Sequence, residues 1–94
     1  MKTGSEKQQV VQSELLSRLK KIEGQVRGVQ KMIQDGRSCG DIVIQLGAIK
    51  AAVNRVGITV LGCHLAEKIE NDLREDNDVN ESLADFITIF KRFS

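Results

Sequence analysis

The chain has 94 residues, enough for one small domain, and its composition excludes several classes of protein. It contains no proline, tryptophan or tyrosine, which favours long uninterrupted helices over a turn-rich β fold. It has no apolar run of about 18 residues and no apolar signal segment near the N-terminus, so we expect a cytoplasmic protein without a membrane partner. In that reducing compartment a permanent disulfide between the two cysteines is not expected. Metal binding, thiol chemistry and simple burial are the roles left for them.

The charge is unevenly distributed along the chain, although the formal net charge is only +1. Residues 1–37 contain eight Lys or Arg against four Asp or Glu, whereas residues 67–94 contain four against eight. This polarity favours a basic surface for an anionic partner. From charge alone, solvated helix faces explain the pattern equally well.

The first predicted element is a helix over residues 9–34, preceded by a flexible tail over residues 1–8. Its apolar residues recur at steps of three and four, which is the period of a helix: Leu15, Leu19, Ile22, Val26, Val29 and Ile33. Gly36 is placed to end this helix. Ser38 is placed to cap the next one, with Asp41 at its third position.

A second helix is predicted over residues 39–73, with a stretch rich in small residues between Leu46 and Val53 that lets another helix approach closely. A loop follows over residues 74–80, and then a third helix over residues 81–93. The apolar residues of the third helix are expected to pack: Leu83, Phe86, Phe90 and Phe93. The predicted fold class is all-α, with a three-helix protomer in one domain over residues 9–94. So small a core makes self-association the expected state.

The candidate site rests on the one histidine and on the cysteine that begins the second helix. Cys39 and His64 are 25 positions apart, which is about 37 Å along a single helix, so they cannot share a ligand within one chain. If two copies of the helix pair antiparallel, with residue n facing residue 103 − n, the two-fold axis falls between Ala51 and Ala52. Cys39 of one chain then meets His64 of the other, which predicts two intersubunit sites per dimer.

The chemistry of this site stays open from the residues alone. Zinc or Cu(I) usually takes three or four ligands, and this pair supplies two. Lys68, one turn beyond His64, would instead stabilise a reactive Cys39 thiolate. Cys63 would fall near Cys39 across the interface, where a disulfide or polysulfide could form, although helix packing is its more common role. A buried structural cysteine beside a hydrogen-bonded histidine is the other alternative. The residues form no catalytic pattern, so we do not expect an enzyme.

Basic and polar side chains follow one face of the first helix and continue onto the second: Arg18, Lys21, Gln25, Lys50 and Arg55. They have no aromatic neighbours for base stacking, and the helices are too long for a helix-turn-helix. These features predict contacts to the phosphates of double-stranded DNA and recognition of its shape. A helical scaffold without a DNA role is the alternative from another class.

The segment RLKKIEGQVRG, residues 18–28, resembles the first-helix signature of the copper-sensing and nickel/cobalt-sensing repressor family (CsoR/RcnR-like, with formaldehyde-responsive FrmR-like members). Cys39 after a short turn, the alanine-rich second helix and His64 complete a resemblance that extends from about residue 10. It implies an antiparallel helical dimer that assembles into a disc-like homotetramer. It also implies a repressor that releases operator DNA when an effector occupies the Cys/His site. Arg18 and Arg55 match the DNA-contacting arginines of the family.

The sequence departs from the family pattern at the sensing site. Copper-responsive members carry a second cysteine where this chain has Lys68. Nickel/cobalt-responsive members carry extra histidines there and near the N-terminus, where this chain has Lys7. The N-terminal proline of formaldehyde-responsive members is absent, and Cys63 alone could replace the second cysteine of persulfide-responsive members. We therefore rank a thiol-reactive effector, an aldehyde or reactive sulfur, slightly above a copper, zinc or nickel ion. The site for such an ion would be completed by water, Asp85 or the N-terminal region.

Overall fold

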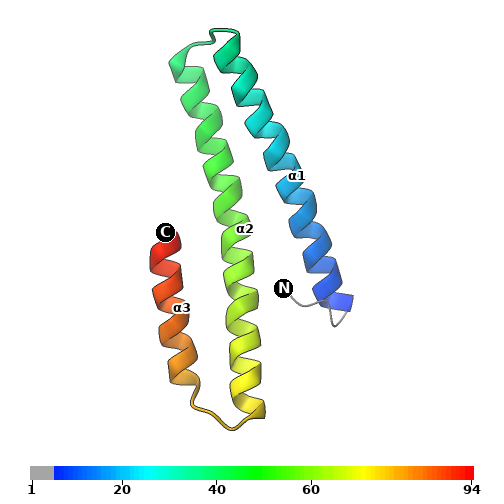
Figure 1. Ribbon diagram of the computed structural model, residues 1–94, viewed down its shortest axis with the longest axis vertical. Helices are drawn as coiled ribbons and strands as arrows, with labels where there is room; N and C mark the ends of the chain where they lie inside the picture. Colours follow the sequence, from blue (N-terminus) through cyan, green and yellow to red (C-terminus); the bar gives the residue numbers. More distant parts are fainter. Residues whose placement is uncertain (1–5) are drawn as a thin grey trace. The chain divides into compact units, whose positions relative to one another are not determined.

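The computed structural model describes residues 6–94, which form three α-helices and no strand (Figure 1). Helix α1 spans Glu6–Gln34, α2 spans Cys39–Arg74 and α3 spans Val79–Phe93. The prediction of an all-α, three-helix protomer is confirmed. Helix α1 begins three residues before the predicted start, so residues 6–8 of the predicted tail are helical, and the rest of that tail lies outside the described residues. Helix α3 begins two residues earlier than predicted.

The chain divides into two compact units, one ending at Val56 and the other spanning Gly57–Ser94. Helix α2 contributes to both, because the division falls within it. The first unit pairs α1 with the beginning of α2, and the second pairs the end of α2 with α3. In each unit the two helices run antiparallel (Figure 1). The prediction of one domain over residues 9–94 stays a prediction.

The turn between α1 and α2 is built from the residues that the sequence indicated. Gly36 has a positive φ of 70°, which glycine adopts without steric cost. The N–H of Arg37 donates to the carbonyl of Met32 at 2.9 Å, which closes the end of α1. The hydroxyl of Ser38 accepts from the N–H of Asp41 at 3.2 Å, so Ser38 caps α2 as predicted.

The turn between α2 and α3 has the same design without a glycine. Asp76 holds the left-handed conformation, with φ of 57°, and the N–H of Asn77 donates to the carbonyl of Asp72 at 2.8 Å. Asp78 caps α3, because its carboxylate accepts from the N–H of Asn80 at 3.0 Å. The predicted loop over residues 74–80 is therefore shorter in the structure, since this cap starts α3 at Val79.

The core of the first unit is a small cluster of Leu15, Ile22 and Val56, against which Val11, Ile49 and Ala52 pack. The predicted apolar stripe of α1 divides into two rows. One row is buried and comprises Leu15, Ile22 and Val29. The other row comprises Leu19, Val26 and Ile33, which are 42%, 41% and 60% exposed. The stripe is wider than the face that a single neighbouring helix can cover.

The second unit packs around a close approach between Phe93 and Gly57. A Cβ atom at Gly57 would lie 2.0 Å from Cζ of the Phe93 ring, so the ring sits where a larger residue would have its side chain. Phe86 and Phe90 stack with their ring centroids 6.1 Å apart. A buried serine, Ser82, donates a hydrogen bond to the carboxylate of Asp72. The packing that the spacing of the apolar residues of α3 predicted is therefore partial, since Leu83, Phe90 and Phe93 stay 40%, 41% and 38% exposed.

Much apolar surface stays exposed on α2, and no large side chain among the described residues is fully buried. The exposed apolar residues of this helix are Val43, Ile44, Leu46, Val53, Ile58, Val60 and Leu73. By length and composition α2 could cross a membrane, but core helices of water-soluble proteins can have the same length and composition. Helix α2 also carries Lys50 and Arg55 near its middle. An exposed apolar surface of this extent is typical of an interface with another molecule.

Replacing Asp76 with glycine is expected to stabilise the protein by about 0.5–1 kcal/mol, since glycine adopts the left-handed conformation at lower cost than aspartate. The change also removes a negative charge beyond the C-terminus of α2, where the helix dipole disfavours it. Thermal unfolding at one fixed protein concentration measures the difference. Asp78→Ala, two residues away, is the control of opposite sign, with an expected loss of about 1 kcal/mol of capping energy. A lower melting temperature for Asp76→Gly would contradict this account of the turn.

Candidate functional site

The first unit carries an open groove of about 440 Å³ with three cationic side chains. Its lining residues, which define the basic groove, are Glu14, Ser17, Arg18, Lys21, Ile22, Gln25, Ala52 and Arg55. The α1–α2 hairpin brings Arg55 beside Arg18 and Lys21, although they are more than thirty positions apart in the sequence. The cations face a shallow open surface, which suits the extended backbone of a polyanion.

The one acidic residue among the described residues that line the basic groove, Glu14, forms an ion pair with Arg18. The guanidinium of Arg18 donates to Oε1 of Glu14 at 2.8 Å, one helical turn away on α1. The two side chains are 41% and 57% exposed, so solvent screens the ion pair and its contribution to stability is small. Glu14 orients Arg18 and also neutralises part of the positive charge of the groove.

The basic groove contains Arg18, Lys21, Gln25 and Arg55, which are four of the five predicted DNA-contacting residues. The fifth, Lys50, is exposed on α2 but does not line the groove. Sequence reasoning missed Glu14, although its position four residues before Arg18 on a helix was a usable signal for an ion pair.

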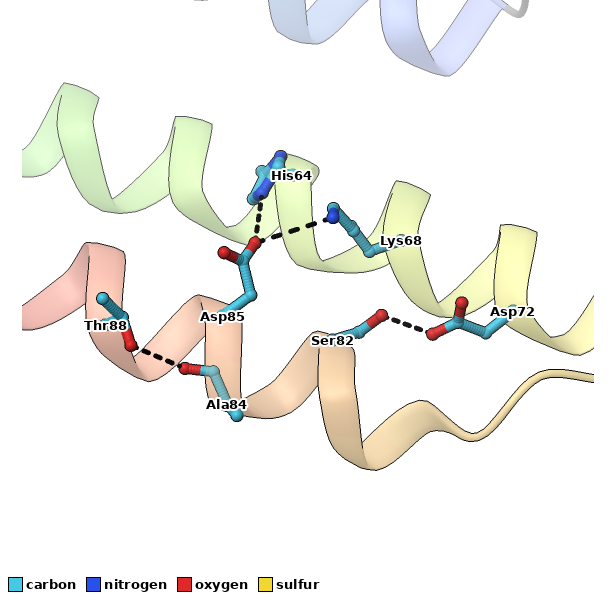
Figure 2. A network of polar contacts seen from close by, with 7 residues as sticks. All are labelled: His64, Lys68, Asp72, Ser82, Ala84, Asp85 and Thr88. Atoms are coloured by element: carbon cyan, nitrogen blue, oxygen red, sulfur yellow. Dashed lines mark hydrogen bonds and ion pairs between the residues drawn. The ribbon is translucent and has the colours of Figure 1, made fainter.

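In the second unit the side chains of His64 and Lys68 contact the same carboxylate oxygen, Oδ2 of Asp85 (Figure 2). Nε2 of His64 lies 3.3 Å from Oδ2 of Asp85, and Nζ of Lys68 lies 3.7 Å from the same oxygen. His64 and Lys68 are one turn apart on α2, and Asp85 comes from α3. We call these residues the His64–Asp85–Lys68 cluster. When the Nε2–H donates to Asp85, Nδ1 keeps its lone pair for a ligand, the usual arrangement of a metal-binding histidine.

Neither cysteine forms a disulfide in the described chain. Cys39 is exposed at the first residue of α2, and Cys63, beside His64, is half-buried. Among residues 6–94 no three His, Cys, Asp or Glu side chains come together as a metal site. The meeting of Cys39 with His64 between two subunits stays a prediction, since it requires a second copy of the chain.

The described chain thus presents a basic groove on one unit and, on the other, an imidazole beside a carboxylate and an ammonium. Comparison with known proteins assigns the family. The family model described as metal-sensitive transcriptional repressor matches residues 11–92. The copper-sensing transcriptional repressor CsoR of Bacillus subtilis (strain 168) is 34% identical over 93 residues, which cover 99% of this chain and 91% of that protein. The chain belongs to the metal-sensitive transcriptional repressor family.

Two solved structures share the fold. The copper-sensing repressor CsoR with Cu(I) from Geobacillus thermodenitrificans NG80-2 superposes with a TM-score of 0.78 at 38% identity, over 99% of this chain and 93% of that one. The nickel-responsive transcriptional regulator InrS superposes with a TM-score of 0.75 at 32% identity, over 100% and 98% of the two chains.

These relatives bear on the alternatives that the sequence left open. They are described as transcriptional repressors or regulators, which supports the repressor over the helical scaffold and over an enzyme. They respond to metals, so they support the metal ion that we ranked second. The preference for an aldehyde or reactive sulfur, based on Lys68 in place of a second cysteine, receives no support from them.

Replacing Glu14 with glutamine is expected to strengthen binding of a polyanion about threefold, because the basic groove loses its acidic residue and Arg18 loses its partner. The measurement is the salt concentration that elutes each protein from immobilised heparin. Glu23→Gln removes the same charge from α1 outside the groove and is the matched control. Equal shifts for the two variants would mean that net charge matters and the groove does not.

Proposed function

We propose that this protein is a cytoplasmic, homotetrameric repressor that binds double-stranded operator DNA and releases it when a transition-metal ion binds between subunits. The effector is a copper, zinc or nickel ion, held by Cys39 of one subunit and His64 of the next. The observation that carries the proposal is the membership of the family over residues 11–92, in a chain that has an open groove lined by three cationic side chains.

DNA binding is assigned to the basic groove. Arg18, Lys21 and Arg55 would contact phosphates, and Gln25 would add a polar contact. Groove residues from several copies would together form the broad basic surface that a duplex requires, since one groove spans a short stretch of backbone. Lys50, which lies outside the groove, would act through long-range attraction alone.

Assembly is assigned to the exposed apolar surface of α2. The small residues near the middle of α2 include Gly47, Ala48 and Ala51, all exposed, so a second copy of the helix can approach closely there. Antiparallel pairing about this point covers apolar side chains and brings Cys39 to His64 of the other subunit. The exposed row of α1, which comprises Leu19, Val26 and Ile33, offers further surface for a tetramer.

The donor atoms suit a transition metal. A thiolate and an imidazole are preferred ligands of Cu(I), Zn(II) and Ni(II), and Nδ1 of His64 is free when Nε2–H donates to Asp85. Two donors leave the ion short of a full set, and water would supply the rest, because Asp85 already accepts from the other nitrogen of the same ring. Cys63, half-buried beside His64, is assigned to packing.

Repression and sensing are linked by binding free energies. A metal ion can release DNA only if it favours a form of the protein that has lower affinity for DNA. The same coupling requires that bound DNA weakens metal binding by an equal factor.

The double substitution Arg18→Ala with Arg55→Ala is expected to weaken operator binding by at least about a hundredfold, because hydrogen bonds to charged groups contribute about 1.5–3 kcal/mol each. The slope of the logarithm of the binding constant against the logarithm of the salt concentration should decrease by the amount that corresponds to about two phosphate contacts. Fluorescence anisotropy with the DNA upstream of the gene, at several salt concentrations, measures both. Arg74→Ala, which removes an exposed arginine from the end of α2, is the control and should bind normally. Normal binding by the double variant would refute the assignment of the groove.

The substitution Cys39→Ala is expected to leave DNA binding intact and to abolish release by metal. Zn(II), Cu(I), Ni(II), formaldehyde and polysulfide are each titrated against the DNA-bound protein and its variant. Cys63→Ala is the matched control and should respond like the natural protein. If formaldehyde or polysulfide releases the DNA and no metal does, the metal proposal is wrong and the thiol-reactive alternative replaces it.

A further inference from the structure

A band of mostly neutral polar side chains runs along the N-terminal half of α1. Among residues 6–94 it lines a hollow of about 460 Å³, and we call it the polar stripe: Gln9, Gln12, Ser13, Leu16, Ser17 and Lys20. Its members recur at steps of three and four, so they share one face of the helix. Ser13 lies about 200° around the helix from Leu15, which is buried, so the stripe faces away from the core of the first unit.

The polar stripe is continuous with the basic groove. Ser17 lines both hollows, and a third hollow, of about 620 Å³, shares Gln9 and Ser13 with the stripe and Glu14 with the groove. A molecule that extends beyond the groove along α1 would therefore meet the stripe next. From Gln9 to Lys20 the stripe is about 16 Å long, which is roughly half of one turn of B-DNA.

The two surfaces differ in their chemistry. The basic groove has three cationic side chains, which suit phosphates, whereas Lys20 is the one charged member of the stripe. Gln9, Ser13 and Ser17 are exposed, and Leu16 is 55% exposed. An amide donates and accepts hydrogen bonds, as the edge of adenine does in the major groove, a hydroxyl can do the same, and an apolar side chain can contact the methyl group of thymine. The stripe thus matches base edges, and the groove matches phosphates.

We propose that the polar stripe reads the base sequence of the operator while the basic groove holds the phosphate backbone. Gln9 and Ser13, which are one turn apart and both exposed, are assigned to base edges, and Lys20 is assigned to a flanking phosphate. The major groove of B-DNA admits an α-helix, so the exposed face of α1 can reach base edges there. The inference rests on the proposed DNA binding and adds the residues that give it sequence specificity.

The test is the selection of bound duplexes from a pool of random sequence by the full-length protein, followed by fluorescence anisotropy on the most enriched duplex and on a scrambled one. The natural protein should enrich a defined motif. The double substitution Gln9→Ala with Ser13→Ala should lose the preference at one or more base pairs of that motif. Its affinity for the enriched duplex should fall about tenfold, as expected for one lost bidentate contact to a base. Its affinity for the scrambled duplex and its salt dependence should not change, because the phosphate contacts are retained.

Two other variants give the opposite result and the control. Arg18→Ala with Arg55→Ala should weaken binding to the enriched and the scrambled duplex alike and lower the salt dependence, because it removes phosphate contacts. Asn71→Ala removes an exposed amide from α2 in the second unit and should behave like the natural protein. Circular dichroism melting of each variant shows that an altered affinity does not arise from unfolding.

The possible outcomes separate this inference from the proposed function. If the Gln9 and Ser13 variant enriches the same motif, or loses affinity equally for both duplexes, the stripe does not read bases and the inference is wrong, while the repressor stands. If the natural protein binds duplex DNA without enriching any motif, the inference is wrong as well. If the natural protein binds no duplex, the proposed function fails, and the inference fails with it.

Discussion

Each helix of this chain carries more apolar surface than the chain itself can bury. On α1, Leu15 and Ile22 enter the core of the first unit, whereas Leu19, Val26 and Ile33 on the adjoining row stay in contact with solvent. Helix α2 repeats the pattern over its whole length, since it packs on α1 in one unit and on α3 in the other. In the proposed assembly other copies would cover the remaining surface, and assembly and folding would then be coupled.

The two candidate sites share an electrostatic design. In the basic groove Glu14 partners Arg18, and in the second unit Lys68 partners Asp85. In each case a charged residue already has a counter-ion from its own chain. Both pairs are well exposed, so they are weak. In the basic groove such a counter-ion lowers the affinity for a polyanion, and in a regulatory protein a moderate affinity allows the response to reverse.

Helix α2 is the element through which the proposed DNA and metal sites can influence each other. Arg55 lies on it in the first unit, and His64 lies on it in the second. The two proposed sites therefore share one helix, on either side of the division between the units.

Most of the secondary structure was predictable because it depends on local interactions. The period of apolar residues located the helices, and Gly36 and Ser38 marked the turn between α1 and α2 through their own backbone and side-chain chemistry. The errors fell at the helix ends. Asp76 adopts a conformation that usually requires glycine, and Asp78 caps α3 earlier than the apolar pattern indicated. Several Asp and Asn residues in one loop offer more than one cap, and helix packing selects among them.

The sequence by itself determined the three helices, Cys39 and the one histidine as candidates for a sensing site, and the basic face of α1, because these depend on residue type and helical period. The tertiary structure decided which side chains contact one another. It placed Asp85 beside His64, paired Lys68 with the same carboxylate oxygen, and left Lys50 outside the basic groove. The reason is physical: helical period gives the direction of a side chain around its own helix, whereas contacts between helices depend on how two packed surfaces align.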